Sequence, residues 1–228
     1  MRSILQVLAI TLAASAGTLR AEPFVPTDPQ QVLLRVAPGA AVREGQGGSG
    51  TTAASLSDAL RIAAQYIDHG RRTEQPAGFG RAEAILEQWR EQAGESAPWH
   101  ILSADIRQYR HEYSQAIALL QRALEIDPRA ARAYLMRASI QQTRGDFAAA
   151  RADCAALLSL GEGPLASVCL AQVLGLAGHL ERARNLLLTM VGDSPGSLAQ
   201  PQVRIWMLEA LADMEDRLGN VAAAERAL

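Results

Sequence analysis

Apolar residues recur every three or four positions through most of the chain after residue 57, and short polar or glycine-containing segments interrupt them. This spacing places the apolar side chains on one face of a helix. Ser55 or Asp58 supplies the short polar side chain that favours a helix start. Pro and Gly fall between the periodic segments, and no segment alternates apolar and polar residues as a strand does. The pattern predicts an all-α chain.

The connections between the predicted helices repeat along the chain. Gly145 in RGDFAAA, Gly178 in AGHLERA and Gly219 in LGNVAAA are each followed by an apolar residue two positions later and an alanine five positions later. An alanine also lies seven positions before each glycine. The first two glycines are 33 residues apart, and the third is 41 residues further on. A period near 33 residues predicts helical hairpins that stack on their neighbours.

The alanines follow from close helix packing. Ala138 and Ala150 are expected where the two helices of one hairpin cross, because only small side chains fit there. Gly145 allows the positive φ that a tight connection needs. Asp146 is expected to cap the second helix, and Phe147 to pack against the pair.

The stretch ARAYLMRASIQQTRGDFAAARADCAALLSLG at 131–161 resembles the tetratricopeptide repeat family. Tyr134 matches the first aromatic position of the family, Ala138 and Ala150 its small positions, and GDF at 145–147 its turn. The preceding copy begins at Trp99 and differs from the family pattern by one extra residue in its turn. The resemblance implies a right-handed α-solenoid of stacked helix–turn–helix repeats.

The chain divides into three regions. Arg2, a short apolar run and small residues predict a secretory signal peptide at 1–21, cleaved near 16 or 21; an uncleaved anchor is the alternative. Residues 22–56 are rich in Pro and Gly and predict a mostly irregular linker. The repeat array is expected at 57–228. Its repeats are expected at 57–92, 97–128, 131–162, 164–191 and 203–228. The first is degenerate, with a longer loop RRTEQPAG between its helices. The last is incomplete, so we expect the chain to be a fragment of a longer array.

Charge and composition narrow the function classes. The formal net charge is −2 and all 22 basic residues are arginine, with no basic stripe. Nucleic-acid binding therefore has little electrostatic support. No segment after the signal peptide is apolar for long enough to span a membrane. Together with the signal peptide, these features predict a soluble bacterial protein that is periplasmic or secreted.

The titratable residues form no recognisable catalytic or metal-binding motif. The four histidines, His69, His100, His111 and His179, lack the spacing of zinc sites. The glycine-rich stretch at 45–50 follows no predicted strand, so it indicates a linker and no nucleotide loop. No nucleophile, base and orienting group can be named together. We therefore expect no enzyme activity, cofactor or metal.

Cys154 and Cys169 are the only cysteines. They fall on the second helix of one predicted repeat and the first helix of the next, which are neighbours in the stack that the resemblance implies. In an oxidising compartment an even cysteine count favours pairing, so we expect a disulfide. Two buried free thiols are the alternative.

The resemblance also implies a binding groove. In this family the first helices line a concave surface that binds extended peptides or partner helices. The Lys and Asn set with which some members clamp a terminal carboxylate is replaced here by Leu135 and Ser139, or Val168 and Gln172, so no such clamp is expected. Trp206 is the strongest single contact candidate, unless it packs into the neighbouring repeat. The expected groove residues are His100, Arg107, Arg132, Leu135, Ser139, Gln142, Val168, Gln172, Leu176, Trp206, Glu209 and Asp213.

Two functional hypotheses follow. The first is a non-enzymatic periplasmic scaffold that binds a protein or peptide partner in its groove, in envelope or complex assembly. The second is a regulatory or recruiting module of a larger enzyme that continues beyond residue 228.

Overall fold

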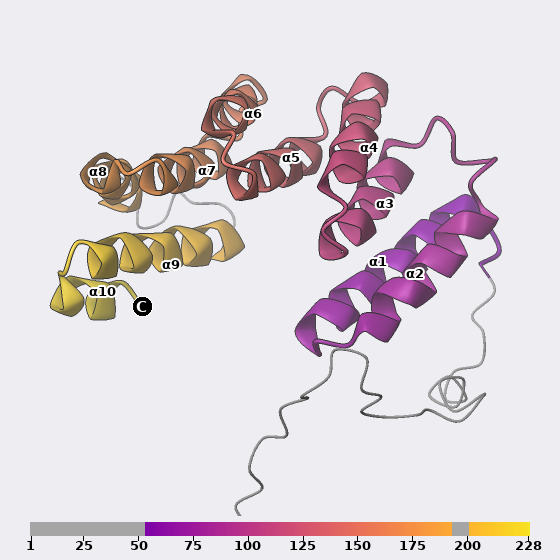
Figure 1. The fold of residues 1–228 in the computed structure, drawn as a ribbon, viewed down its shortest axis with the longest axis horizontal. Helices are drawn as coiled ribbons and strands as arrows, with labels where there is room; N and C mark the ends of the chain where they lie inside the picture. Colours follow the sequence, from indigo (N-terminus) through magenta and orange to yellow (C-terminus); the bar gives the residue numbers. More distant parts are fainter. Residues whose placement is uncertain (1–52, 193–200) are drawn as a thin grey trace, which may run out of the picture. The chain divides into compact units, whose positions relative to one another are not determined.

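The structure is a computed structural model that describes residues 53–192 and 201–228 (Figure 1). The predicted signal peptide at 1–21 and nearly all of the predicted linker at 22–56 lie outside these residues. Every regular element in the described part of the chain is an α-helix, which confirms the predicted fold class. The helices are α1 (Leu56–Arg72), α2 (Pro76–Gln88), α3 (Ala97–Tyr109), α4 (Tyr113–Ile126), α5 (Ala131–Thr143), α6 (Phe147–Ser159), α7 (Gly163–Leu176), α8 (Leu180–Gly192), α9 (Pro201–Arg217) and α10 (Val221–Ala227).

The helices pack in consecutive pairs, from α1 with α2 to α9 with α10 (Figure 1). The first helices of neighbouring pairs also touch, α1 with α3, α3 with α5, α5 with α7 and α7 with α9. The two helices of a pair bury their small residues against each other, and each pair covers part of the next. The apolar surface is therefore buried by stacking neighbours.

The two helices of each pair are joined by a three-residue turn, and the middle residue of that turn has a left-handed backbone conformation. That residue is Gly145 (φ 76°), Gly178 (φ 87°) or Gly219 (φ 81°) in the last three pairs, and Glu74 (φ 54°) or His111 (φ 61°) in the first two. In each turn the next residue donates its N–H to the carbonyl five positions earlier, which pairs a carbonyl left free at the helix end.

This geometry corrects two expectations about the first two pairs. The longer loop expected at 71–78 is a turn of only three residues, because α1 continues through Arg72 and Pro76 already begins α2. Proline suits the first helical turn, where its missing N–H would have no partner. The turn before α4 contains no extra residue, because His111 takes the position of the glycine. Trp99 therefore lies one position before the equivalent of Tyr134.

The pair formed by α5 and α6 packs as its sequence predicts. Ala138 and Ala150 are fully buried in one core cluster, and Phe147 packs against its edge. The Asp146 side chain accepts a hydrogen bond of 3.1 Å from the backbone N–H of Ala149, and so caps α6. The small residues are thus requirements of helix packing.

The first pair solves the same packing problem with glycines. Ile67 and Phe79 stand at its two equivalents of the alanines, and both are buried. In this pair the two helices approach each other most closely at Gly70 and Gly78 instead. A Cβ atom added to Gly78 would lie 2.6 Å from the carbonyl oxygen of Tyr66 and 2.9 Å from the Cα of Gly70, so α1 and α2 would have to separate.

Gly78→Ala is therefore expected to lower the free energy of unfolding by about 1–3 kcal/mol, as overpacking does elsewhere. Gly80→Ala is the matched control in the same helix, because an added Cβ there meets nothing within 4 Å. Alanine at Gly80 should stabilise by about 0.5–1 kcal/mol through helix propensity. Urea unfolding of both variants measures the two effects, and equal shifts would refute the glycine contact.

Candidate functional site

A buried carboxylate in α3 joins the first helices of three pairs. Asp105 is fully buried, at 0 % exposure, and both of its oxygens are paired. Arg71 of α1 donates to Oδ1, and Arg132 of α5 donates from Nη2 to Oδ2 at 2.6 Å. Burying a carboxylate without such partners would be costly, and the two arginines offset that cost. We call these three residues the arginine cluster.

The arginine cluster opens onto a cavity of about 440 Å³. Both arginine side chains remain 51 % exposed although they hold a buried partner. Guanidinium groups carry five N–H donors, of which each arginine uses one on Asp105. The cavity is lined by Arg61, Ala64, Gln65, Ile67, Asp68, Arg71 and Arg132.

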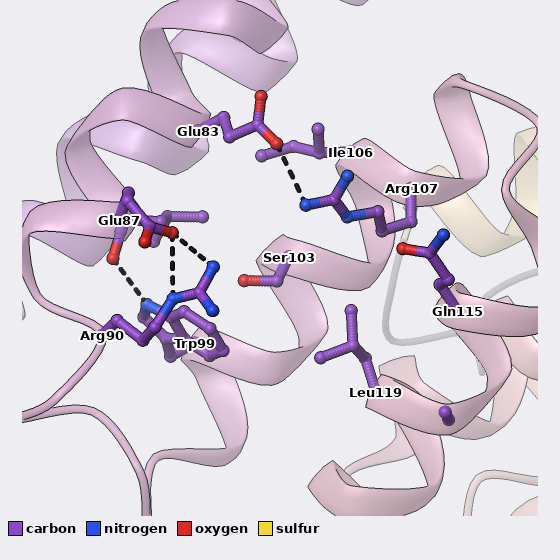
Figure 2. A pocket seen from close by; sticks show the side chains of 11 residues that line it. Glu83, Glu87, Arg90, Trp99, Ser103, Ile106, Arg107, Gln115 and Leu119 are labelled. Carbon is purple, nitrogen blue, oxygen red and sulfur yellow. Dashed lines mark hydrogen bonds and ion pairs between the residues drawn. The ribbon is translucent and has the colours of Figure 1, made fainter.

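A second cavity, of about 310 Å³, lies between α2, α3 and α4 (Figure 2). Its apolar lining includes Trp99, whose indole N–H donates to the Leu86 carbonyl at 2.9 Å. At its rim the Arg107 guanidinium lies 3.1 Å from Glu83 and 2.9 Å from Glu112. Arg107 is therefore held by two carboxylates and lies outside the cavity of the arginine cluster.

A third cavity, of about 410 Å³, lies on α9 and α10, with acidic side chains among its lining. Glu209 and Asp213 are exposed there, together with Asp216 and Glu225. Arg217 lies 3.3 Å from Asp213. The three cavities thus differ in charge, and the first is lined by two arginines from different helix pairs that hold one buried carboxylate.

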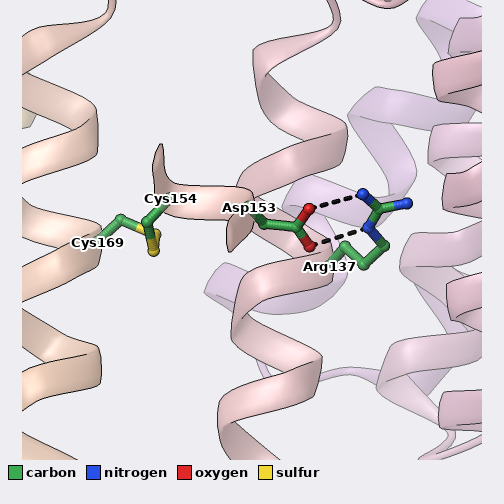
Figure 3. Close-up of a disulfide and its surroundings, with 4 residues drawn as sticks. All are labelled: Arg137, Asp153, Cys154 and Cys169. Atoms are coloured by element: carbon green, nitrogen blue, oxygen red, sulfur yellow. Dashed lines mark hydrogen bonds and ion pairs between the residues drawn. A yellow bond between two sulfur atoms is a disulfide. The ribbon is translucent and has the colours of Figure 1, made fainter. Parts of the chain in front are cut away.

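The structure joins Cys154 of α6 and Cys169 of α7 in a disulfide, with Cα atoms 5.6 Å apart (Figure 3). Both cysteines are buried. On the other side of α6, Asp153 receives two hydrogen bonds from Arg137 of α5, at 2.9 and 2.6 Å. These bonds raise the pKa of the Arg137 guanidinium above its ordinary value. Two neighbouring residues therefore tie α6 to α7 and to α5.

In the described residues, no group of three or more His, Cys, Asp and Glu side chains could hold a metal ion. None of the helices in this part of the chain is both long and apolar enough to cross a membrane.

No protein-family model matches the chain, and no curated protein matches it in sequence. Among solved structures, MamA from residue 41 of Desulfovibrio magneticus RS-1 is 14 % identical with a TM-score of 0.51, and covers 76 % of this chain and 93 % of its own. A MamA RS-1 double mutant is 14 % identical with a TM-score of 0.50, over 76 % of this chain and 92 % of that one. MamA is a tetratricopeptide repeat protein. This chain has the tetratricopeptide repeat fold. PilW, a type IV pilus biogenesis factor, is 19 % identical over 76 % of this chain and 91 % of its own, with a TM-score of 0.36.

The tetratricopeptide register can be counted from the middle residue of each turn. Six positions earlier lies a polar residue in every pair, whereas seven positions earlier lies a buried alanine or, in α1, Ile67. We call the polar set the first-helix column. It consists of Asp68, Asp105, Ser139, Gln172 and Asp213.

Several of the residues expected in the groove have accessible side chains. Arg132 lines the first cavity, Ser139 is exposed, and Gln142 and Gln172 are half-buried. Leu176 is half exposed.

Other expected groove residues pack into the core. Val168 was expected in the groove, but it is fully buried in the cluster that joins α7, α8 and α9, which corrects that prediction. Leu135 is half-buried against the cluster of α5 to α7. Trp206 is half-buried and packs against the same cluster as Val168, so it contributes to the core.

In α3 the structure shifts the expected register by one residue. The prediction of His100 and Arg107 takes Trp99 as the equivalent of Tyr134, whereas the turn at His111 makes His100 that equivalent. The ring of His100 lies against Trp99 and its Nε2 is 3.2 Å from the Gly94 carbonyl oxygen. Counting back from His111 would have selected Asp105 instead. Arg71 had no signal in sequence, because its partner is 34 residues away.

Proposed function

We propose that this chain is a non-enzymatic scaffold that binds a protein or peptide along the first-helix column, in envelope or complex assembly. The observation that carries the proposal is the column itself, which keeps a polar residue at the same position in all five described pairs. The column adjoins the arginine cluster and its open cavity. Three members of the column, Asp68, Ser139 and Asp213, are exposed and can form hydrogen bonds with a partner. Asp105 is buried and is held by its two arginines.

We further propose that the scaffold acts in the periplasm or another extracytoplasmic compartment. Stable disulfides persist mainly in oxidising compartments, and Cys154 and Cys169 form one in the structure. The signal peptide predicted from the first 21 residues supports the same location.

The binding surface can be tested with one bulky substitution and a matched control. Ser139→Tyr would place a large ring on the first-helix column, whereas Ala152→Tyr would place the same ring on an exposed position of α6. We expect the protein and its Ala152→Tyr variant to capture the same partners from a periplasmic extract, and Ser139→Tyr to lose them. Equal thermal unfolding of the two variants is the folding control. The same captured set for all three proteins would contradict the proposed surface.

A further inference from the structure

The charges around the first cavity do not balance. Among the described residues, Arg61 pairs with Asp58 at 3.2 Å, and Arg72 pairs with Asp68 at 2.7 Å. Those four charges cancel in pairs. The arginine cluster instead holds two guanidinium groups, Arg71 and Arg132, on the single carboxylate of Asp105. One positive charge is left at the edge of the cavity.

The geometry shows where a second carboxylate would bind. Asp105 is buried beneath the two arginines, and its two oxygens are already occupied. Arg71 and Arg132 each donate to Asp105 through Nη2, so their other N–H groups are not bonded to that carboxylate. Each of the two side chains is half exposed, and both line the cavity. An anion there would face the arginines from the solvent side, as Asp105 faces them from the core.

A purely structural role explains less of this arrangement. One arginine is enough to neutralise a buried aspartate, as Arg137 does for Asp153, and that arginine is 16 % exposed. The second arginine adds charge that must be hydrated in the free protein. Guanidinium groups are weakly hydrated and bind carboxylates through several hydrogen bonds, so this charge favours an acidic ligand.

We propose that the arginine cluster recognises an Asp or Glu side chain within an extended segment of the partner. This inference rests on the proposed function, because the segment would continue along the first-helix column. The recognition involves arginines of α1 and α5, which belong to the first and third pairs and are joined by Asp105 of the second. The partner's acidic residue would complete two guanidinium–carboxylate pairs where the chain supplies one carboxylate.

The test selects displayed random dodecapeptides on the whole chain and on three variants, and then measures the binding of the selected peptides to Ser139→Tyr as well. Arg132→Gln removes the surplus charge but leaves Arg71 on Asp105. Arg122→Gln is the control, because it removes an equal charge from the exposed surface of α4, and neither it nor the carboxylates it pairs with line the cavity. Asp105→Asn keeps the side-chain volume and raises the net charge of the arginine cluster. Thermal unfolding of each variant shows that it is folded.

We expect Asp and Glu to be enriched among peptides selected by the original chain and by Arg122→Gln. Synthetic copies of these peptides should bind Arg132→Gln roughly ten- to a hundredfold more weakly, because a hydrogen bond to a charged group is lost. They should bind Asp105→Asn more tightly, which tests the inference even if Arg132→Gln fails to fold. Their affinity should fall with added salt.

The possible outcomes separate the two proposals. In one outcome, the selected peptides lose binding in Ser139→Tyr and yet show no excess of acidic residues. That result would overturn the proposal of an acidic ligand and leave the scaffold function standing. An acidic excess that persists unchanged in Arg132→Gln and Asp105→Asn would also overturn it. If no selected peptide depends on Ser139, the proposed function fails and this inference fails with it.

Discussion

Replacing Arg137 with methionine is expected to lower the free energy of unfolding by about 3–5 kcal/mol, because it leaves a buried carboxylate without its partner. Asp153 is 6 % exposed on its side chain, and Arg137 holds it with two hydrogen bonds (Figure 3). The guanidinium also donates to Gln121 at 2.5 Å, which links α4 to the same point. Methionine keeps the length of the apolar stem and removes the charge.

A matched control comes from an arginine on the surface of the preceding pair. Arg122 lies 2.9 Å from Glu95 and 3.2 Å from Glu125, but all three side chains are substantially exposed. Arg122→Met should therefore change the unfolding free energy by about 0–1 kcal/mol. Chemical unfolding of the two variants under the same conditions makes the comparison, and similar losses would contradict a special role for the buried pair.

The double variant Arg137→Met with Asp153→Leu separates lost attraction from stranded charge. If most of the loss in Arg137→Met comes from the unpaired carboxylate, removing that carboxylate should restore much of the stability. A double variant no more stable than Arg137→Met would instead assign the loss to the bonds themselves and to the packing of the arginine stem.

The helix pairs were predictable because residues close together in the sequence mark each repeat. A residue able to adopt positive φ, an apolar residue two positions later and an alanine five positions later mark three of the turns, and the structure places Gly145, Gly178 and Gly219 in the left-handed region as expected. Glu74 and His111 adopt the same left-handed conformation although neither is a glycine, the residue type that indicates it in a sequence. The first two turns were therefore misjudged in length, although the helices around them were expected.

The candidate site was predictable only where it depends on position within a repeat. Ser139 and Gln172 follow from counting along one helix, and they lie in the first-helix column. Asp105 was missed through a shift of one residue. Its partners Arg71 and Arg132 come from the pairs on either side, at separations of 34 and 27 residues. Side-chain pairing across repeats depends on rotamers and burial, which no periodic pattern encodes.

Reducing the disulfide is expected to lower the free energy of unfolding by about 3 kcal/mol. Cys154 and Cys169 are 15 residues apart in the chain, and closing a loop of that length removes conformational entropy from the unfolded state. The urea midpoint should fall in the presence of a reductant. The dependence of the unfolding free energy on urea should also steepen, because the reduced unfolded chain exposes more surface.

The control for this effect is the double variant Cys154→Ala with Cys169→Ala, whose unfolding should not respond to the reductant at all. Both cysteines are buried, so the reductant must be present during unfolding and refolding. Thiol titration gives the direct measurement: the denatured, unreduced chain should show no reactive thiol, and two should appear after reduction. Two thiols before reduction would disprove the bridge, and with it one of the two supports for an extracytoplasmic location. No thiols before reduction but an unchanged urea midpoint would contradict the predicted stabilisation by the bridge.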